Sequence, residues 1–274
     1  MDNDRDTSLQ SWKFLTLFPA QVTKLATLDY NLGEAYTTVG QLLPEVLGSR
    51  AQLDFYCGQP PGVAVANSEW PEIDPRLRLS VAGKLMGLAA AGTVRESLVN
   101  EVLEWYEESA ATAGGKFTEF PRVFGPRLRE ALCEDGSDRT LRDVAATAQE
   151  VFSRYVVKIV ELLLGHVGGR GAVDGLVLTG GCALNVLANQ AVVDRLGLPH
   201  VYVPPSPNDG GLAVGGVWAK TRAGNGCDIG QLQTAPLSVA FHSFRLIFRR
   251  PIISRSGLER ECLSLERARA ERPR

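Results

Sequence analysis

The sequence predicts an α/β fold, because two strand-like runs alternate with glycine turns and helical segments in its second half. A short apolar run, Leu176 to Leu178, is typical of a strand buried in a parallel sheet, and Gly180-Gly181 follows it as a turn without β-carbons. A helix is expected to start near Ala183, and Val201 to Val203 form a second strand. A second glycine turn, Asn208 to Gly211, leads into another helix. This order predicts a parallel pair of strands joined by a crossover helix.

The two glycine turns are expected to meet, because the carboxyl ends of parallel strands lie at the same edge of a sheet, where open α/β sheets bind ligands. The helix after Gly180-Gly181 would direct its free amides at an occupant of the turn, where anions are favoured. Asp209 adds a carboxylate beside Gly210 and Gly211. Since a diglycine also serves as a plain tight connection, spacing alone leaves a ligand site and a purely structural turn open as alternatives.

Four segments carry a family resemblance, in the order in which they occur along the chain. They are YNLGEAYTTV (30–39), GKLMGLAAAG (83–92), DVAATAQE (143–150) and a glycine-turn unit that contains GGCALN (180–185) and NDGGLA (208–213). Together they resemble the O-carbamoyltransferases of the NodU/CmcH type, whose motifs have the forms SLGxxYxxxT, GEYKVMGLAPYG, DIAASAQ, GGxALN and GDAGGA. The resemblance implies a lobe of the actin-like ATPase fold, which is a duplicated ribonuclease H-like architecture.

The resemblance also implies a reaction: ATP-dependent transfer of a carbamoyl group from carbamoyl phosphate to the hydroxyl of a small molecule, through a carbamoyl-adenylate. Asp209 matches the family's metal-ligating aspartate, and a divalent metal there, iron or magnesium, would polarise phosphate oxygens. Lys84 has a structural alternative, as a lysine on a helix surface, and Asn185 has one as a residue that satisfies the backbone of a helix start. By their places in the matched motifs, the resemblance assigns binding of the nucleotide to six residues: Lys84, Gly180, Gly181, Asn185, Gly210 and Gly211.

The sequence departs from the family in its first lobe and in its C-terminal domain, neither of which has a counterpart here. The family's HxxHA motif supplies paired histidines that hold the metal, whereas His166, His200 and His242 are not spaced as a helical pair. The metal site is therefore expected to be incomplete, with Asp209 alone. We interpret the chain as a second-lobe fragment of a carbamoyltransferase, from a truncated or incompletely predicted gene.

Two alternatives to a carbamoyltransferase remain open. One is a non-catalytic remnant that binds a nucleotide or a protein partner. The other is a different enzyme of the same architecture, either a sugar kinase or a relative of the tRNA threonylcarbamoyl-adenosine enzymes. Similarity of fold does not choose among them, because one architecture hosts many functions.

Composition limits the partners and the location. The 274 residues carry a formal net charge of -2, which gives no reason to expect nucleic acid or an anionic membrane as a partner. The acidic segment 1–6 and the short apolar patch 12–20 support neither a signal peptide nor a membrane span, so a cytoplasmic location is expected. Reduced thiols are predicted for the five cysteines, which show no CxxC pairing: Cys57, Cys133, Cys182, Cys227 and Cys262.

Apolar residues recur at helical intervals in three further segments, which are predicted to be helices: 28–47, 94–113 and 141–167. The segment 48–75 is predicted to be rich in loops, because it contains Pro-Pro, glycines and Trp70-Pro71. The domain prediction consists of an unassigned segment at 1–24, one lobe at 25–225 with a helical insertion at about 48–140, and an unassigned Arg-rich tail at 226–274, interpreted as a divergent or poorly folded terminus.

Overall fold

The computed structural model describes residues 15–17, 22–24, 32–61, 65–66, 69–78, 80–111, 119–120, 124–173, 175–198, 200–213 and 245–249. The α-helices are α1 (Leu32–Gln41), α2 (Pro44–Leu47), α3 (Ala51–Gly58), α4 (Pro75–Arg78), α5 (Val81–Ala89), α6 (Glu96–Ala111), α7 (Pro126–Arg129), α8 (Asp138–His166) and α9 (Val186–Leu196). The strands are β1 (Leu15–Leu17), β2 (Val22–Lys24), β3 (Val65–Ala66), β4 (Glu119–Phe120), β5 (Gly175–Thr179), β6 (Val201–Tyr202) and β7 (Arg245–Arg249). The π-helix η2 (Glu130–Asp135) and the 3-10 helices η3 (Arg170–Ala172) and η4 (Gly181–Leu184) complete the elements.

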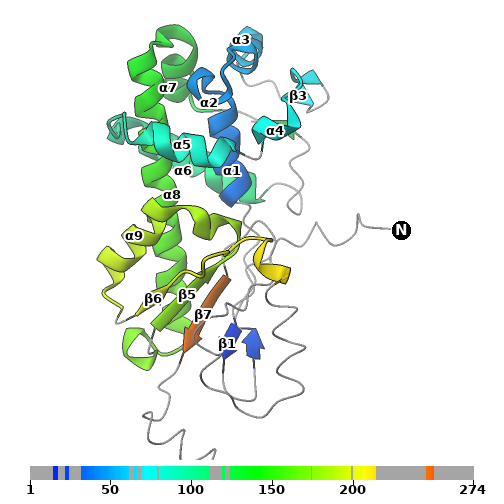
Figure 1. The fold of residues 1–274 in the computed structure, drawn as a ribbon. Coiled ribbons are helices and arrows are strands. Elements are labelled where there is room, and N and C mark those ends of the chain that lie inside the picture. The colour runs from blue at the N-terminus through cyan, green and yellow to red at the C-terminus, as the bar shows by residue number, and fades with distance from the viewer. Residues whose placement is uncertain are drawn as a thin grey trace, which may run out of the picture.

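Helices and a small sheet with a parallel strand pair fit the predicted α/β class. Strands β5 and β6 are parallel, with Leu176 opposite Val201, and α9 connects them as expected. The larger sheet has the strand order β2-β1-β7-β5-β6. Figure 1 shows helices α1 to α7 at one end of the molecule and this sheet at the other. A separate two-stranded sheet consists of β3 and β4.

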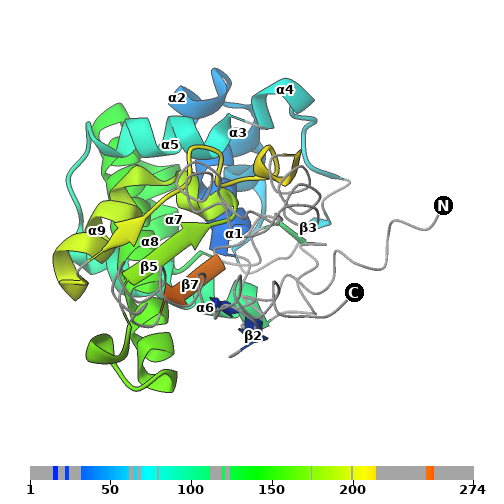
Figure 2. The ribbon, with the colours of Figure 1, turned by 60° about the horizontal axis from the view of Figure 1, so that its bottom comes forward.

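The sheet also contains strands from both segments that the sequence left unassigned. Strand β7 lies in the Arg-rich tail and runs antiparallel to β5, with Gly175 opposite Arg249. Figure 2 shows β7 beside β5, with β2 on its far side. The tail, interpreted from the sequence as a divergent or poorly folded terminus, contributes residues 245–249 to the sheet, and the rest of it lies outside the described residues.

Helix α8 is the central packing element and confirms the helix predicted at 141–167. The Ser137 hydroxyl accepts a hydrogen bond from the N–H of Thr140 at 3.3 Å and so caps the helix start. With 29 residues, α8 is about 43 Å long, which lets it extend from the helical end to the sheet (Figure 1). It packs against α1, α5, α6 and α9. The buried stripe on α8 includes Val144, Ala148, Val151, Phe152, Ile159 and Leu163.

The helices predicted at 28–47 and 94–113 are confirmed within the described residues, whereas the segment predicted to be rich in loops also contains a helix. Within the segment 28–47 the structure has α1 and, from Pro44, the separate short helix α2; within 94–113 it has α6. Residues 28–31 and 112–113 lie outside the described residues. The loop-rich prediction for 48–75 is wrong at its start, because α3 forms there and buries Leu53 and Tyr56. No helix among the described stretches has both the length and the apolar character needed to cross a bilayer.

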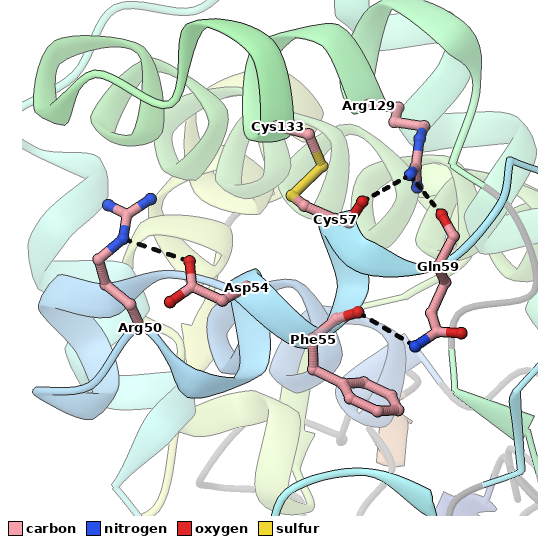
Figure 3. The surroundings of a disulfide bond; sticks show 7 residues. All are labelled: Arg50, Asp54, Phe55, Cys57, Gln59, Arg129 and Cys133. Carbon is pink, nitrogen blue, oxygen red and sulfur yellow. Dashed lines mark hydrogen bonds and ion pairs between the residues drawn. A yellow bond between two sulfur atoms is a disulfide. The ribbon is translucent and has the colours of Figure 1, made fainter.

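A disulfide joins α3 to η2, so the prediction of reduced thiols is wrong for one pair. Cys57 and Cys133 are bonded across 76 residues of sequence, and the bond therefore closes a loop that contains most of the helical insertion. Arg129 lies beside it and donates hydrogen bonds to the carbonyl oxygens of Cys57 at 3.1 Å and Gln59 at 2.7 Å (Figure 3). Residue spacing did not reveal this pair, because tertiary packing of α3 against η2 brings the two cysteines together.

Candidate functional site

The two glycine turns lie against each other. The backbone N–H of Gly180 donates to the carbonyl oxygen of Pro207 at 2.7 Å, which joins the first turn to the loop that leads into Asp209. Both turns follow the carboxyl ends of the parallel strands β5 and β6, and Figure 1 shows them at the same edge of the sheet. The predicted convergence of the two turns is confirmed.

The first turn has a backbone geometry that favours glycine. Gly180 has φ 97° and ψ 165°, a region that side-chain-bearing residues rarely adopt. Gly181 then starts η4, in which the N–H of Ala183 donates to the carbonyl oxygen of Gly180 at 3.0 Å. Helix α9 consequently begins at Val186 rather than near Ala183, because the 3-10 turn separates it from the diglycine.

A buried hydrogen-bond network holds Asn185, the residue directly before α9. Its Oδ1 accepts from the N–H of Ala188 at 3.0 Å, which caps the helix, and from Nε2 of Gln149 at 3.1 Å. Its Nδ2 donates to Oε1 of Gln149 at 3.0 Å. The Tyr36 hydroxyl donates to the same Oε1 at 2.6 Å, and Gln149 Nε2 also donates to Ser153 Oγ at 3.0 Å. We call these contacts the Tyr36–Gln149–Asn185 network; they give Asn185 the capping role that was the alternative to nucleotide binding.

Three of the motifs that carried the resemblance meet in this network. Tyr36 belongs to the motif at 30–39, whose first two residues lie outside the described residues, and Gln149 belongs to the motif at 143–150. Burial raises the pKa of Tyr36 well above its ordinary value, so the hydroxyl stays protonated and donates. Sequence reasoning missed both side chains, although a signal was present: Gln149 lies on the apolar stripe of α8, where an uncharged amide needs a partner.

The second turn is built around Asn208 and Asp209. The N–H of Gly211 donates to the carbonyl oxygen of Asn208 at 3.0 Å, and the N–H of Leu212 donates to the backbone carbonyl oxygen of Asp209 at 3.0 Å. These bonds bend the chain into a helical turn at 211–213, after which the predicted helix lies outside the described residues. Asp209 and Gly210 are exposed. Within the described part of the chain, no hydrogen bond or ion pair engages the Asp209 carboxylate.

Lys84 has a contact at a different place in the fold, on α5. Its Nζ donates to the carbonyl oxygen of Val46 at 3.2 Å, in the last turn of α2, where a cation is favoured by the helix dipole. This contact corresponds to the structural alternative for Lys84. Phosphate binding by Lys84 stays a prediction, as do the nucleotide roles of Gly180, Gly181, Asn185, Gly210 and Gly211.

Comparison with known proteins identifies the family. The model of the Carbamoyltransferase N-terminus family matches residues 19–218. The chain belongs to this family. The chain is 32% identical over 162 residues to nodulation protein U of Bradyrhizobium diazoefficiens. It is 30% identical over 158 residues to nodulation protein U of Sinorhizobium fredii. Each match covers 54% of this chain and 28% of the relative, so the match spans less than a third of the relatives' length. No solved structure matches the chain.

The family motif at 83–92 ends in a tight joint between α5 and α8. A β-carbon on Gly92 would overlap the carbonyl oxygen of Arg142. The Asp143 carboxylate accepts from the N–H of Thr93 at 2.8 Å and pairs with the Arg95 guanidinium at 2.8 Å. Burial opposes ionisation of Asp143, but these hydrogen bonds and the Arg95 charge outweigh it and hold the pKa below its ordinary value. Two motifs of the carbamoyltransferase family therefore meet here in a structural contact.

Groups suited to metal or nucleophilic chemistry are sparse near the turns. Within the described residues, no cluster of three or more His, Cys, Asp or Glu side chains is arranged to hold a metal ion. Cys182, between the diglycine and Asn185, is a buried thiol outside the disulfide, and burial raises its pKa to about 12. It is therefore protonated at neutral pH and unsuited to act as a nucleophile. His242, Cys227 and Cys262 lie outside the described residues.

A buried hydroxyl beside the first turn was not predicted from the sequence. Thr179 ends β5 directly before Gly180 and is 1% exposed. Its Oγ1 has no hydrogen-bond partner within the described part of the chain. A buried hydroxyl without a partner is costly in free energy, which makes Thr179 a candidate for contact with a ligand at the turn.

Proposed function

We propose that this chain provides the nucleotide-binding part of a carbamoyltransferase. The enzyme would use ATP to transfer a carbamoyl group from carbamoyl phosphate to the hydroxyl of a small molecule through a carbamoyl-adenylate, and its fold would be an actin-like ATPase lobe. The observation that supports this proposal most is the hydrogen bond between Gly180 and Pro207, because it holds the diglycine and the Asp209 turn together at the carboxyl edge of parallel strands. Open α/β sheets commonly bind their ligands at this edge.

The residues of the two turns would divide the nucleotide between them. Gly180 and Gly181 lack side chains that would block the approach of a phosphate or a sugar. Gly210 and Gly211 would let the second turn approach from the other side. Thr179 would satisfy its buried hydroxyl with a ligand oxygen.

The Asp209 carboxylate would ligate a divalent cation that polarises phosphate oxygens. A magnesium ion in a nucleotide site takes one or two carboxylates and fills its other positions with water and phosphate oxygens. One exposed carboxylate fits that arrangement. The cation is iron or magnesium in this proposal, and Asp209 is the ligand that this chain would supply to either.

Calorimetric titration with ATP, with and without magnesium, tests the binding part of this proposal. We expect Asp209→Asn to weaken magnesium-dependent ATP binding by about tenfold, which corresponds to the removal of one charged interaction. Asp194→Asn is the matched control, because Asp194 is an exposed carboxylate on α9 that accepts a hydrogen bond from Gln190 Nε2 at 2.7 Å. Absence of ATP binding to the wild-type chain at millimolar concentration, or equal affinities of both variants, would contradict the proposal.

The products of turnover distinguish the proposed reaction from its alternatives. Formation of a carbamoyl-adenylate breaks the bond between the α- and β-phosphates of ATP and the bond from the carbamoyl group to its phosphate, so it releases pyrophosphate and inorganic phosphate. Transfer of the carbamoyl group to a hydroxyl then releases AMP, so the proposed reaction predicts pyrophosphate and AMP that depend on carbamoyl phosphate. A sugar kinase releases ADP and phosphorylates a sugar from a panel. A non-catalytic remnant binds ATP and releases none of these products under any metal.

A further inference from the structure

The Tyr36–Gln149–Asn185 network lies directly behind the first glycine turn. It links α1, α8 and the start of α9. Along the sequence, Tyr36 and Gln149 are 113 residues apart, and Gln149 and Asn185 are 36 residues apart. All three side chains are buried. A hydrogen-bond network of this kind, in a region of low dielectric, strongly favours one geometry of the groups that it joins.

Asn185 has little capacity left for a ligand. A side-chain amide accepts two hydrogen bonds and donates two. Its Oδ1 already accepts from Ala188 and Gln149, and its Nδ2 already donates to Gln149. Because these contacts occupy its amide and the residue is 7% exposed, Asn185 is better suited to hold the turn than to contact a nucleotide.

Gln149 has all four hydrogen-bonding positions of its amide filled. Its Oε1 accepts from Tyr36 at 2.6 Å and from Asn185 at 3.0 Å. Its Nε2 donates to Asn185 at 3.1 Å and to Ser153 at 3.0 Å. The Gln149 amide is therefore fixed from three directions, and it transmits the position of α1 and α8 to Asn185.

Asn185 in turn determines the shape of the first turn. Its backbone N–H donates to the carbonyl oxygen of Cys182 in η4 at 3.0 Å. One turn further along α9, the Asn189 side chain donates to the carbonyl oxygen of Ala183 at 2.7 Å. The 3-10 turn that starts at Gly181 is thus tied to the helix start that Gln149 holds.

We infer that Gln149 is a positioning residue for the first glycine turn: through Asn185 it fixes the backbone that the nucleotide meets, and Asn185 serves as its intermediary. This inference rests on the proposed function, because it takes the diglycine turn as the nucleotide site. The effect on affinity is indirect, since removal of the Gln149 amide shifts the turn and deletes no group that touches the nucleotide.

A pair of tyrosine variants separates positioning from general stabilisation. Tyr36→Phe removes the hydroxyl that holds Gln149, and Tyr106→Phe removes a buried hydroxyl that donates to the carbonyl oxygen of Ala148 at 3.4 Å, beside the network but outside it. We expect Tyr36→Phe to weaken ATP binding by about threefold to tenfold, and Tyr106→Phe to leave it within about twofold. Equal affinities of the two variants would overturn the inference.

A double-mutant cycle tests the role of Asn185. Gln149→Met keeps length and helix propensity but removes the amide, and Asn185→Ser keeps an oxygen that can cap α9. If Gln149 acts through Asn185, each variant weakens ATP binding by about tenfold and the double variant weakens it by about the same factor. A product near one hundredfold would indicate that Asn185 contacts the ligand independently, and it would overturn the inference.

Amide hydrogen exchange without nucleotide provides a readout that does not depend on binding. Gln149→Met and Tyr36→Phe are expected to speed exchange in residues 180–189, whereas Tyr106→Phe is not. Unchanged exchange in that segment would overturn the inference even where the wild-type chain binds ATP. Faster exchange in a chain that binds no ATP would uphold the positioning of the turn and contradict the proposed function.

Discussion

Replacing Asp143 with alanine is expected to lower the free energy of unfolding by about 2 to 3 kcal/mol. The carboxylate accepts from the N–H of Thr93 at 2.8 Å and pairs with the Arg95 guanidinium at 2.8 Å. Loss of the backbone hydrogen bond contributes about 1 kcal/mol. The ion pair contributes the rest, and its share is reduced because the Arg95 side chain is 34% exposed and regains water in the variant.

Urea unfolding followed by circular dichroism measures this difference. Glu161→Gln is the control, because its ion pair with Arg170 at 3.3 Å is 52% exposed on both sides, and exposed pairs contribute less than about 1 kcal/mol. A loss below about 0.5 kcal/mol for Asp143→Ala at pH 7 would refute the view that this contact stabilises the joint between α5 and α8.

The Asp143 ion pair also predicts a pH dependence. Burial opposes its ionisation, but the Thr93 N–H and Arg95 hold its pKa below the ordinary value. Such a carboxyl contributes stability that is fully present above its unfolded pKa of about 3.9 and is lost as the pH falls through the folded pKa. The stability difference between wild type and Asp143→Asn should therefore stay constant from pH 7 to about pH 5 and narrow below about pH 4. A difference that persists unchanged to lower pH would exclude the charge as its source.

Three further predictions concern packing, the disulfide and the buried hydroxyl. Gly92→Ala is expected to destabilise the chain by about 3 kcal/mol, because its β-carbon would meet a backbone carbonyl of α8. Gly87→Ala is the control, because a β-carbon there has open space on α5 and should stabilise the chain by up to about 1 kcal/mol. Thermal unfolding compares the two variants, and equal midpoints would contradict the close approach at Gly92. Reduction of the Cys57–Cys133 bond, which closes a 76-residue loop, should lower the free energy of unfolding by about 4 kcal/mol. A reductant should therefore lower the thermal midpoint of the wild type but not that of Cys57→Ser, and an equal change in both midpoints would contradict a stabilising disulfide. Thr179→Val should leave the stability of the free chain unchanged or raised and weaken ATP binding in calorimetry, and unaltered affinity would remove Thr179 from the site.

The parts of the fold that could be predicted from the sequence are those with local signals. The apolar run before Gly180-Gly181 predicted β5, and the helical segment between it and the next apolar run predicted β6 as a parallel partner. The period of apolar residues predicted α8 over nearly its whole length. The convergence of the two turns followed from the geometry of parallel strands alone, and the hydrogen bond from Gly180 to Pro207 agrees with it.

The parts that could not be predicted depend on contacts between distant segments. Strand β7 has a short apolar centre between arginines and no alternating pattern, and it is defined by pairing with β5. The Cys57–Cys133 bond depends on how α3 packs against η2. The role of Gln149 depends on partners in α1 and before α9, so a sequence pattern reveals only that a polar side chain lies on an apolar stripe.

Tyr36, Gln149 and Asn185 come from three separate motifs, yet their side chains form one hydrogen-bond network. Removing one of them leaves another buried group without a partner, at a cost of about 1 to 3 kcal/mol, so the three motifs constrain one another through this network. Similarity at these positions therefore indicates a shared scaffold behind the glycine turns.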